Sequence, residues 1–440
     1  MKTLRTLAAI IVALAIIGGG AQAQMQSSLA KKENSGTMPI GLGATFVNGE
    51  TFYLVNIAPE VAFGKLGIGL DINLRFNTQG KIRAGEYETF GDYLRIIRYV
   101  RWAQKGDPFY IRVGQLDYSL LGHGFIMYNY RNSSSYDLRK TGMELDLNFE
   151  KFGFESMYSD FAGKGVLGLR GYVRPLKFTT AGKIPVLGGL ETGVTYAADL
   201  NENANKKYDA VAKKSTGDGS VSVVGFDAGL PLLSLSMLKS TLYFDYAKIV
   251  NYGSGSAAGI DLHASGMGLL SLSAKYERRF IGDRFIPSYF DALYERDRFV
   301  PLDTLRFVSK VMALENAPSV QGYYGELLLS ILNTVTIIGG YQAPLGVPNA
   351  GTMHLELQTG NVIPAIVVGG GYDKKNIGSV FTLDENSILY AQVGYKPMPY
   401  LLVSTLYQWT WAQEKNAAGN VVGYKTQRRI EPKVSLVFSF

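Results

Sequence analysis

Apolar and polar residues alternate with a period of two along almost the whole chain, and helical periodicity is hard to find. Over residues 66–77 the even positions are apolar, whereas the odd positions are glycine, polar or charged. The same alternation recurs over residues 143–150, 353–358 and 401–411. Because successive side chains of a strand point to opposite faces of a sheet, this pattern predicts strands with one apolar and one small or polar face.

The length of these strands indicates a membrane protein. They run to about 9 to 14 residues, whereas globular strands average about 5 to 6 and membrane-spanning strands need about 9 to 11. Beyond the N-terminus no apolar run comes near the roughly 18 residues of a spanning helix. In lipid, only helices and closed barrels pair every backbone group. We therefore predict an all-β fold, a transmembrane antiparallel β-barrel of about 18 strands (range about 16 to 20).

The connections between the predicted strands alternate in length. Long polar stretches cover residues 77–91, 117–140, 199–220, 372–386 and 412–423, and tight breaks fall at residues 63–65, 104–108, 151–153, 331–334, 359–362 and 396–399. Long extracellular loops and short periplasmic turns are typical of outer-membrane barrels. A count gives roughly 19 candidate strands, and both ends of such a chain should lie in the periplasm, which requires an even number. Residues 304–314 are the candidate for one more strand.

The N-terminus has the features of an export signal. Lys2 and Arg5 precede an apolar run at residues 7–17, and Ala21 and Ala23 supply a small-x-small cleavage pattern. This run is too short to span a bilayer, which takes about 20 residues, and the chain has no cysteine for a lipoprotein anchor. We expect three parts, namely a signal peptide at residues 1–23, a short periplasmic segment at residues 24–39, and a single barrel domain at residues 40–440.

The last predicted strand gives the most specific signal. Val434, Leu436, Phe438 and the terminal Phe440 share one face. A final strand that ends in Phe, with apolar residues at alternate positions, resembles the assembly signal of Gram-negative bacterial outer-membrane β-barrel proteins, and the whole pattern is porin-like. The resemblance implies a location in the bacterial outer membrane after signal-peptide cleavage. It also implies contact with outer-membrane lipids and recognition by the barrel-assembly machinery during biogenesis.

Composition excludes several other classes of protein. Charged residues make up 18 % and hydrophobic residues 47 %, with 51 Gly, 28 Tyr and no Cys. Disorder needs low hydrophobicity and high charge, and disulfide scaffolds need thiols. The net charge of +7 is scattered along the chain, so we expect no nucleic-acid partner but a mild anion preference inside a pore. We expect the surplus Gly at strand bends or at places of close approach within strands, as at residues 41–43, 67–69 and 369–371, and the Tyr in aromatic girdles at the membrane boundaries.

Motifs for catalysis or metal binding are missing from the sequence. His123 lies between two glycines, and nearby Ser133 suggests a Ser/His hydrolase at the rim of a barrel. A histidine in this context is more typical of a turn. There is no zinc, phosphate-binding or calcium-loop motif. We therefore expect no enzyme activity, no metal and no cofactor.

Charged residues on the polar strand faces are the candidates for the wall of a lumen. Arg95 and Arg101, with Arg112 on the next strand, form a candidate basic patch, and Glu144 and Asp146 face the same interior. Arg98 has the opposite parity. Opposed basic and acidic residues would polarise a constriction, and the alternative is that they are solvated in a wide lumen. The full set of candidates is Asp71, Arg75, Arg95, Arg101, Arg112, Glu144, Asp146, His354 and Glu356.

A second charged cluster interrupts the strand pattern at residues 277–298. Aromatic residues are interleaved with acidic and basic ones there. Two interpretations are open, a segment folded into the barrel as a short helix or plug, and an ordinary ordered loop. The candidate residues of the inward-folded segment are Arg278, Arg279, Arg284, Asp291, Arg296 and Arg298.

These observations predict a passive outer-membrane channel for small hydrophilic solutes. The lumenal face is polar, and residues 24–39 are too few for a globular plug. A transporter of hydrophobic compounds is the first alternative, but barrels of that class carry an N-terminal hatch with an Asn-Pro-Ala motif, which this sequence lacks. A structural or secretion-associated barrel without pore activity and a surface hydrolase are the others. The solute and the oligomeric state, with a homo-oligomer as one option, stay open.

Overall fold

The computed structural model describes residues 34–436, apart from 38–39, 48–49, 85, 89–91, 94, 134–139, 210–213, 266–269, 293, 302–306, 333, 360–363 and 416–420. Most of this part of the chain forms one antiparallel sheet of 23 strand segments. Within the described residues, no helix is long and apolar enough to cross a membrane. The predicted signal peptide, and Phe438 and Phe440 of the predicted assembly signal, lie outside the described residues.

The strands of the sheet lengthen toward the C-terminus. The first are β1 (Asn34–Thr37), β2 (Ile40–Val47), β3 (Glu50–Ile57), β4 (Glu60–Phe63), β5 (Leu66–Leu70), β6 (Ile72–Phe76), β7 (Ile97–Trp102), β8 (Phe109–Gly114), β9 (Gly142–Asn148), β10 (Phe152–Tyr158), β11 (Val166–Val173) and β12 (Glu191–Asp199). They are followed by β15 (Val221–Ser234), β16 (Leu238–Ile249), β17 (Ser254–Ala264), β18 (Leu270–Ile281), β21 (Val320–Ile331), β22 (Val335–Pro344), β23 (Thr352–Thr359), β24 (Ile366–Lys374), β25 (Ser387–Met398), β26 (Leu401–Lys415) and β27 (Val421–Leu436).

The remaining elements lie in the connections between these strands. They are the 3₁₀ turns η1 (Pro175–Phe178), η2 (Thr180–Lys183) and η3 (Leu187–Gly189), the hairpin of β13 (Lys207–Asp209) and β14 (Lys214–Thr216), the hairpin of β19 (Phe299–Pro301) and β20 (Phe307–Ser309), and the short helices α4 (Tyr294–Asp297) and α5 (Val311–Glu315).

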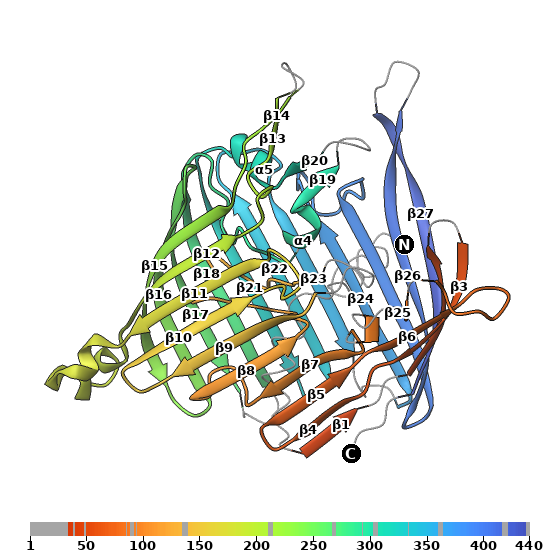
Figure 1. The fold of residues 1–440 in the computed structure, drawn as a ribbon, viewed down its shortest axis with the longest axis horizontal. Helices are drawn as coiled ribbons and strands as arrows, with labels where there is room; N and C mark the ends of the chain where they lie inside the picture. The colour runs from red at the N-terminus through yellow and green to blue at the C-terminus, as the bar shows by residue number, and fades with distance from the viewer. Residues whose placement is uncertain are drawn as a thin grey trace, which may run out of the picture.

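The sheet closes into a barrel (Figure 1), because β2 pairs with β3 along one edge and with β27 along the other. Three crossings of the wall are each made of two short strands, namely β1 with β2, β3 with β4, and β5 with β6. In the sheet, β1 and β5 both pair with β4, and β2 and β6 both pair with β3. Counted in this way, the 23 described segments make 20 crossings. The predicted all-β barrel is confirmed, with an even strand number at the top of the predicted range.

Each long strand turns an apolar face outward and a polar face inward. On β12, β15 and β16, the outward residues Val194, Phe226 and Phe244 are 65 %, 45 % and 43 % exposed, whereas the inward Asp227 and Asp245 are buried. Leaving a side chain of this size in water, instead of burying it, costs roughly 1.5–3 kcal/mol of stability. A continuous belt of such residues around the wall therefore fits a lipid environment.

Glycine and tyrosine share a role inside the barrel. A Cβ atom on Gly259 would lie 2.4 Å from the ring of Tyr243, its partner on the neighbouring strand, so the ring lies directly over the glycine. The same cross-strand arrangement joins Gly69 with Tyr99, Gly153 with Tyr172, and Gly371 with Tyr390. The close approach predicted for glycines in the strands is confirmed at Gly69 and Gly371, whereas these tyrosines belong to no girdle, so the predicted placement of Tyr is wrong for them.

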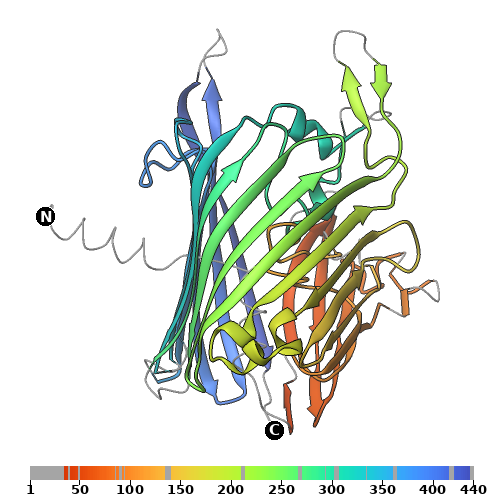
Figure 2. The same cartoon turned by 90° about the vertical axis from the view of Figure 1, so that its left-hand side faces the viewer.

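The two rims of the barrel differ in the length of their connections (Figures 1 and 2). The long ones, residues 77–96, 115–141, 200–220, 282–319 and 375–386, lie at one rim, called the long-loop rim. At the opposite, short-turn rim, most connections resemble the three-residue turn between β15 and β16. The exception there is residues 174–190, which contain η1–η3 and project sideways from the wall.

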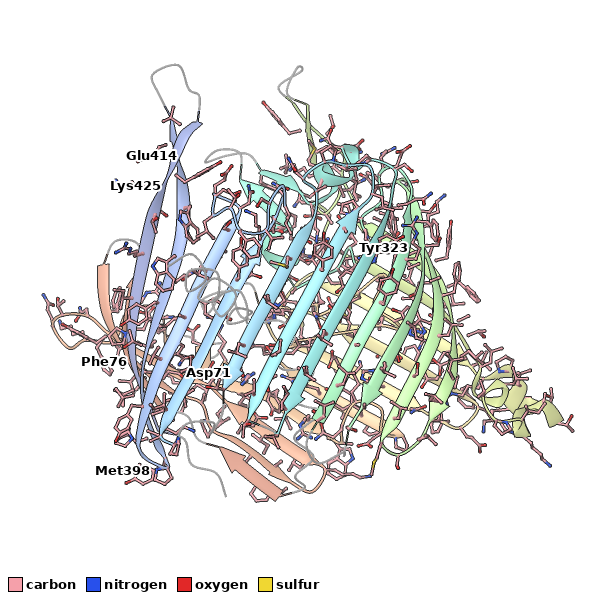
Figure 3. The ribbon with its side chains drawn as sticks, turned by 180° about the vertical axis from the view of Figure 1, so that it is seen from behind. Asp71, Phe76, Tyr323, Met398, Glu414 and Lys425 are labelled. Atoms are coloured by element: carbon pink, nitrogen blue, oxygen red, sulfur yellow. The ribbon has the colours of Figure 1, made fainter. Side chains whose placement is uncertain are left out.

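Two sequence predictions about the connections are wrong. The described part of the predicted strand at residues 304–314, residues 307–314, is not a further strand of the wall, since β20 pairs with β19 in a small separate sheet and α5 follows it. The predicted long loop at residues 412–423 is mostly strand, because β26 continues to Lys415 and β27 begins at Val421. Figure 3 shows this hairpin, marked by Glu414 and Lys425, rising above the rim.

Candidate functional site: the lumen and its two inner loops

Two of the long connections fold into the barrel and pack against each other. We call residues 115–141 the first inner loop and residues 282–319 the second inner loop. The Phe290 N–H donates to the Ile126 carbonyl oxygen over 3.2 Å, and the Tyr128 N–H donates to the Phe290 carbonyl oxygen over 3.1 Å. The loops therefore form one structural unit inside the wall.

The largest apolar core of the described residues lies between these loops and the lumenal face of the wall. A fully buried side chain of this size stabilises by roughly 1.5–3 kcal/mol, so burial favours the position of the loops inside the barrel. The loops contribute Leu116, Leu121, Phe125, Ile126, Met127, Tyr130, Phe285, Tyr289, Phe290, Tyr294, Val311 and Leu314. The wall contributes Met157, Val166, Ala197, Val221, Val223, Ala247, Ile249, Ala257 and Ile281. The aromatic residues of the second charged cluster are therefore folded inward.

The charged residues of that cluster do not lie together. Arg278 and Arg279 are part of β18, where Arg279 faces the lumen and Arg278 lies on the outer face, 4.6 Å from the ring centre of Tyr323. Figure 3 labels Tyr323. The others belong to the second inner loop. Of these, Arg284 pairs with Glu315 at 3.3 Å, Asp291 pairs with Lys310 at 3.0 Å, and the side chain of Arg296 lies outside the described residues.

Arg298 anchors the second inner loop to the wall. Its Nε lies 2.6 Å from Oδ2 of Asp199, its Nη2 contacts Oδ1 of the same carboxylate, and both side chains are buried. The Tyr294 hydroxyl donates to Asp199 over 2.8 Å. Burial, and then the charge of Asp199, raise the pKa of Tyr294 well above its ordinary value, so this hydroxyl keeps its proton. A two-point contact between guanidinium and carboxylate is among the stronger polar contacts in proteins.

A buried guanidinium holds the wall beside the first inner loop. Arg170 lies 2.9 Å from each of three carboxylates, through Nε to Asp227, Nη1 to Glu155 and Nη2 to Glu191. The backbone N–H of Gly122, in the first inner loop, donates to Glu155 over 2.9 Å. Sequence reasoning missed this group, although the alternation at residues 152–158 and 166–173 would have placed Glu155 and Arg170 in the lumen.

A second buried group contacts the first inner loop from β18. Glu277 is fully buried and accepts from Lys275 at 2.9 Å, from Arg279 at 2.6 Å and from the Tyr243 hydroxyl at 2.8 Å. Lys275 also donates to the carbonyl oxygen of His123 over 2.5 Å. The ammonium group thus joins the loop to the wall.

His123 packs against the wall instead of working with a serine. Its ring stacks on Tyr243 with centroids 4.3 Å apart. Burial lowers the pKa of His123 to about 4, so the ring is neutral at neutral pH. Ser133 donates to Asn132 at 3.2 Å, and residues 134–135 lie outside the described residues. The hydrolase suggested by the sequence gains no support from these contacts.

A histidine–serine contact that the sequence did not suggest lies near the short-turn rim. His263 Nδ1 is 2.8 Å from the Ser273 hydroxyl on the neighbouring strand, and its Nε2 is 3.9 Å from Asp261. The second distance is too long for a hydrogen bond, so the carboxylate does not orient the ring. We assign no chemistry to this group.

The predicted basic patch contains Arg101 and Arg112 but not Arg95. Arg101 lies directly opposite Arg112, and Arg112 lies directly opposite Glu144, all on the lumenal face of β7–β9. Arg95 lies in an exposed turn before β7 and pairs with Asp92 at 2.9 Å. The placement of Arg95 on the lumen wall is therefore wrong.

Arg98 contacts the first inner loop on the lumenal side, although strand parity predicted the opposite face. It is the extra residue of a β-bulge, because its two neighbours pair with consecutive residues of β5. A bulge reverses the alternation locally. The Arg98 guanidinium consequently lies 3.2 Å from Asp117 in the first inner loop, and Arg112 lies 2.9 Å from the same carboxylate.

The other predicted lumenal residues face the interior and have polar partners. Asp71 accepts from Asn56 and Asn73, Arg75 pairs with Glu86, Asp146 with Lys105, His354 with Asp373, and Glu356 accepts from Gln358. The His354 and Asp373 side chains are 33 % and 43 % exposed, whereas Arg170 and Asp227 are 2 % and 5 % exposed. We call β9–β12 and β15–β18 the covered wall, and the lumenal face of β7, β8, β23 and β24 the open wall.

Comparisons with known proteins return other barrels. No protein-family model and no curated protein matches the sequence. Wzi of Escherichia coli, a carbohydrate-binding barrel involved in capsule assembly, is 10 % identical over 96 % of this chain and 87 % of its own (TM-score 0.39). OprD of Pseudomonas aeruginosa is 10 % identical over 92 % and 93 % (TM-score 0.33), and a ferric enterobactin receptor mutant (PfeA) of the same organism is 10 % identical over 93 % and 81 % (TM-score 0.37).

The fold of this chain is a porin-like outer-membrane β-barrel. Its closed ladder, apolar exterior and polar interior are the features of that architecture. The location in the bacterial outer membrane follows from the apolar outer face and the polar lumen of this barrel. The likenesses to solved structures extend to this architecture and no further.

Proposed function

We propose that the chain is an outer-membrane channel for small hydrophilic solutes, narrowed by its two inner loops. The observation that carries the proposal is the unequal lumen. The Arg170–Asp227 pair on the covered wall is buried beneath the loops, whereas the His354–Asp373 pair on the open wall keeps a third or more of its side-chain surface accessible. Water and polar solutes would pass along the open wall.

The character of the accessible wall favours polar over hydrophobic solutes. The large apolar side chains that face the interior of the covered wall are packed against the inner loops and are buried. A hydrophobic compound crossing the barrel would need an accessible apolar surface. The transport of hydrophobic compounds, and a barrel without pore activity, are therefore outcomes of the experiment below and not parallel proposals.

The basic residues of the open wall suggest a mild preference for anions. Arg98, Arg101 and Arg112 lie close together on β7 and β8, and the carboxylates near them are Asp117, Glu60 and Glu144. Among the described residues, Arg98 and Arg112 pair with carboxylates whereas Arg101 forms no ion pair, so its charge is available to a passing anion. Charge rings of this kind tune the selectivity of wide pores without excluding either sign.

The experiment uses the fact that the chain contains no cysteine. The protein is refolded into planar bilayers and its conductance is recorded. A single cysteine is introduced at His354, on the open wall, or at Val194, on the outer face. A charged methanethiosulfonate reagent should change the conductance of H354C and leave that of V194C unchanged.

Three results would contradict the channel. They are the absence of conductance steps at any voltage, equal responses of H354C and V194C, and uptake of hydrophobic compounds without ion conductance. Folding of each variant is checked by its heat-dependent mobility in gels, because a collapsed barrel would also fail to conduct.

A further inference from the structure

The connection between β11 and β12 is unlike the other described connections at its rim. Residues 174–190, which we call the foot, carry three successive 3₁₀ turns at the rim where other connections are short. The foot projects sideways from the outer wall (Figures 1 and 2) and does not point along the barrel axis. It therefore lies beside the wall, at the level where lipid headgroups surround a barrel.

The foot is fastened to its own side of the barrel. Arg174 donates its backbone N–H to Lys151 over 2.7 Å and its guanidinium to Phe149 over 2.7 Å, and it pairs with Glu191 at 2.9 Å. The Lys151 ammonium lies 5.1 Å from the ring centre of Phe178. These contacts fix the foot to the turn between β9 and β10 and to the start of β12, so its position is built into the fold.

The backbone of the foot satisfies most of its own hydrogen bonds. An unpaired N–H at a membrane boundary is costly, and here the turns pair theirs locally. The residues whose N–H donates to a carbonyl oxygen inside the foot are Lys177, Thr179, Gly182, Ile184, Leu187, Gly188, Gly189 and Leu190. The foot is thus a compact unit whose turns pair much of their backbone locally.

The surface of the foot is apolar and basic. Phe178, Ile184, Val186 and Leu187 are 60 %, 48 %, 40 % and 46 % exposed. Residues 174–190 contain three basic residues and no acidic one. Exposed aromatic and aliphatic side chains with basic residues beside them are typical of segments that lie in the membrane interface and attract anionic lipids.

The apolar surface of the foot continues that of the wall. On the neighbouring turns of the same rim, Phe149, Phe152, Leu235 and Met237 are also large and exposed. Because the apolar outer face of the wall fits a lipid environment, the foot extends this apolar surface outward. This continuity favours lipid over a protein as its occupant.

We propose that the foot is a membrane-interface anchor, which inserts Phe178, Ile184 and Leu187 among the lipids at the short-turn rim and binds anionic phospholipid headgroups through its basic residues. This role is independent of conduction. It would fix the depth and tilt of the barrel on the side of the covered wall.

The test places a single environment-sensitive fluorophore on the full chain through an introduced cysteine. Phe178→Cys reports on the foot, Val194→Cys is the lipid-facing reference, and Ala162→Cys, exposed at the long-loop rim, is the water-facing reference. Each protein is reconstituted in phosphatidylcholine vesicles with or without phosphatidylglycerol, and quenching by a lipid-attached quencher is compared with quenching by iodide.

The label at residue 178 should be quenched from the lipid, as at residue 194, and shielded from iodide. In vesicles with phosphatidylglycerol, Lys177→Gln combined with Lys183→Gln should lower the anionic-lipid dependence of this shielding by at least about fivefold. A label at 178 as open to iodide as that at 162, in both vesicle types, would overturn the proposal. Shielding from iodide that requires an added periplasmic protein fraction would also overturn the proposal. Shielding that is equal with and without phosphatidylglycerol would refute the binding of anionic headgroups by the basic residues.

Discussion

Replacing Arg298 by Met should release the second inner loop from the lumen. The guanidinium of Arg298 is paired at two points with Asp199, and both side chains are buried. Met has a similar length but no charge, so the variant leaves the Asp199 carboxylate buried with only the Tyr294 hydroxyl as a described side-chain donor. The wall itself is untouched, because Arg298 belongs to the connection and not to a strand.

The size of this effect follows from the cost of an unpaired buried charge. Removing one partner of a buried ion pair typically costs about 3–5 kcal/mol, which corresponds to a roughly 100- to 4,000-fold shift of an equilibrium at about 1.4 kcal/mol per factor of ten. Arg284, in the same loop, is a matched control. Its 3.3 Å pair with Glu315 is partly exposed, and such pairs contribute about 0–1 kcal/mol.

Amide hydrogen exchange of the refolded protein measures the effect directly. In Arg298→Met, peptides from residues 282–301 should exchange much faster and the conductance of the channel should rise. Arg284→Met should behave as the unmodified protein. Adding Asp199→Asn to Arg298→Met should restore part of the protection, because the buried charge is then gone. Equal protection in Arg298→Met and Arg284→Met would refute the assignment of Arg298 as an anchor.

Three further outcomes are expected. The pKa of His123 is lowered to about 4 when the first inner loop is docked, against about 6.5 for an exposed histidine. The released loop therefore binds more protons, and its docking should weaken by about 2 kcal/mol between pH 7 and pH 5. His123→Phe keeps the stacking and should abolish this pH dependence of hydrogen exchange. Arg101→Gln with Arg112→Gln should shift the reversal potential in a salt gradient toward cation preference, and an unchanged potential would exclude these residues from the ion path. Gly259→Val should displace the Tyr243 ring and lower the temperature at which the barrel unfolds in gels by several degrees, whereas unaltered unfolding would show that the ring has room to move.

Strand alternation predicted the wall well, because one physical rule governs every crossing. Residues 143–150 and 353–358 face the sides that their parity gave them, with Glu144, His354 and Glu356 inside. The rule failed at Arg98, where a bulge adds one residue, and nothing in the local sequence marks a bulge. It failed at Arg95, which precedes the strand and pairs with Asp92 in a turn.

The interior of the barrel was much harder to predict than its wall. Alternation assigns residues to a face, but it does not say whether a long connection turns inward or outward. The aromatic residues interleaved at residues 277–298 were the only sequence signal for the second inner loop, and the first inner loop gave none. Pairs such as Arg170 with Asp227, 57 positions apart, depend on which strands become neighbours and on which loop covers them.

The charged residues of the lumen therefore have two separable roles, although they share one strand face. Arg170 and Glu277 are buried, and each pairs with a residue that contacts the first inner loop, so their replacement should change how firmly the loop occupies the lumen. Arg101 and the pair of His354 with Asp373 are accessible to solvent, so their replacement should change ion preference at constant occupancy. Single-channel records distinguish these two effects. A change in how the loops occupy the lumen appears as altered conductance levels or opening times, and a change in ion preference appears as a shifted reversal potential. A charge that altered both would have to lie where the inner loops meet the open wall, and Arg112, which pairs with Asp117 of the first inner loop, is the residue in that position.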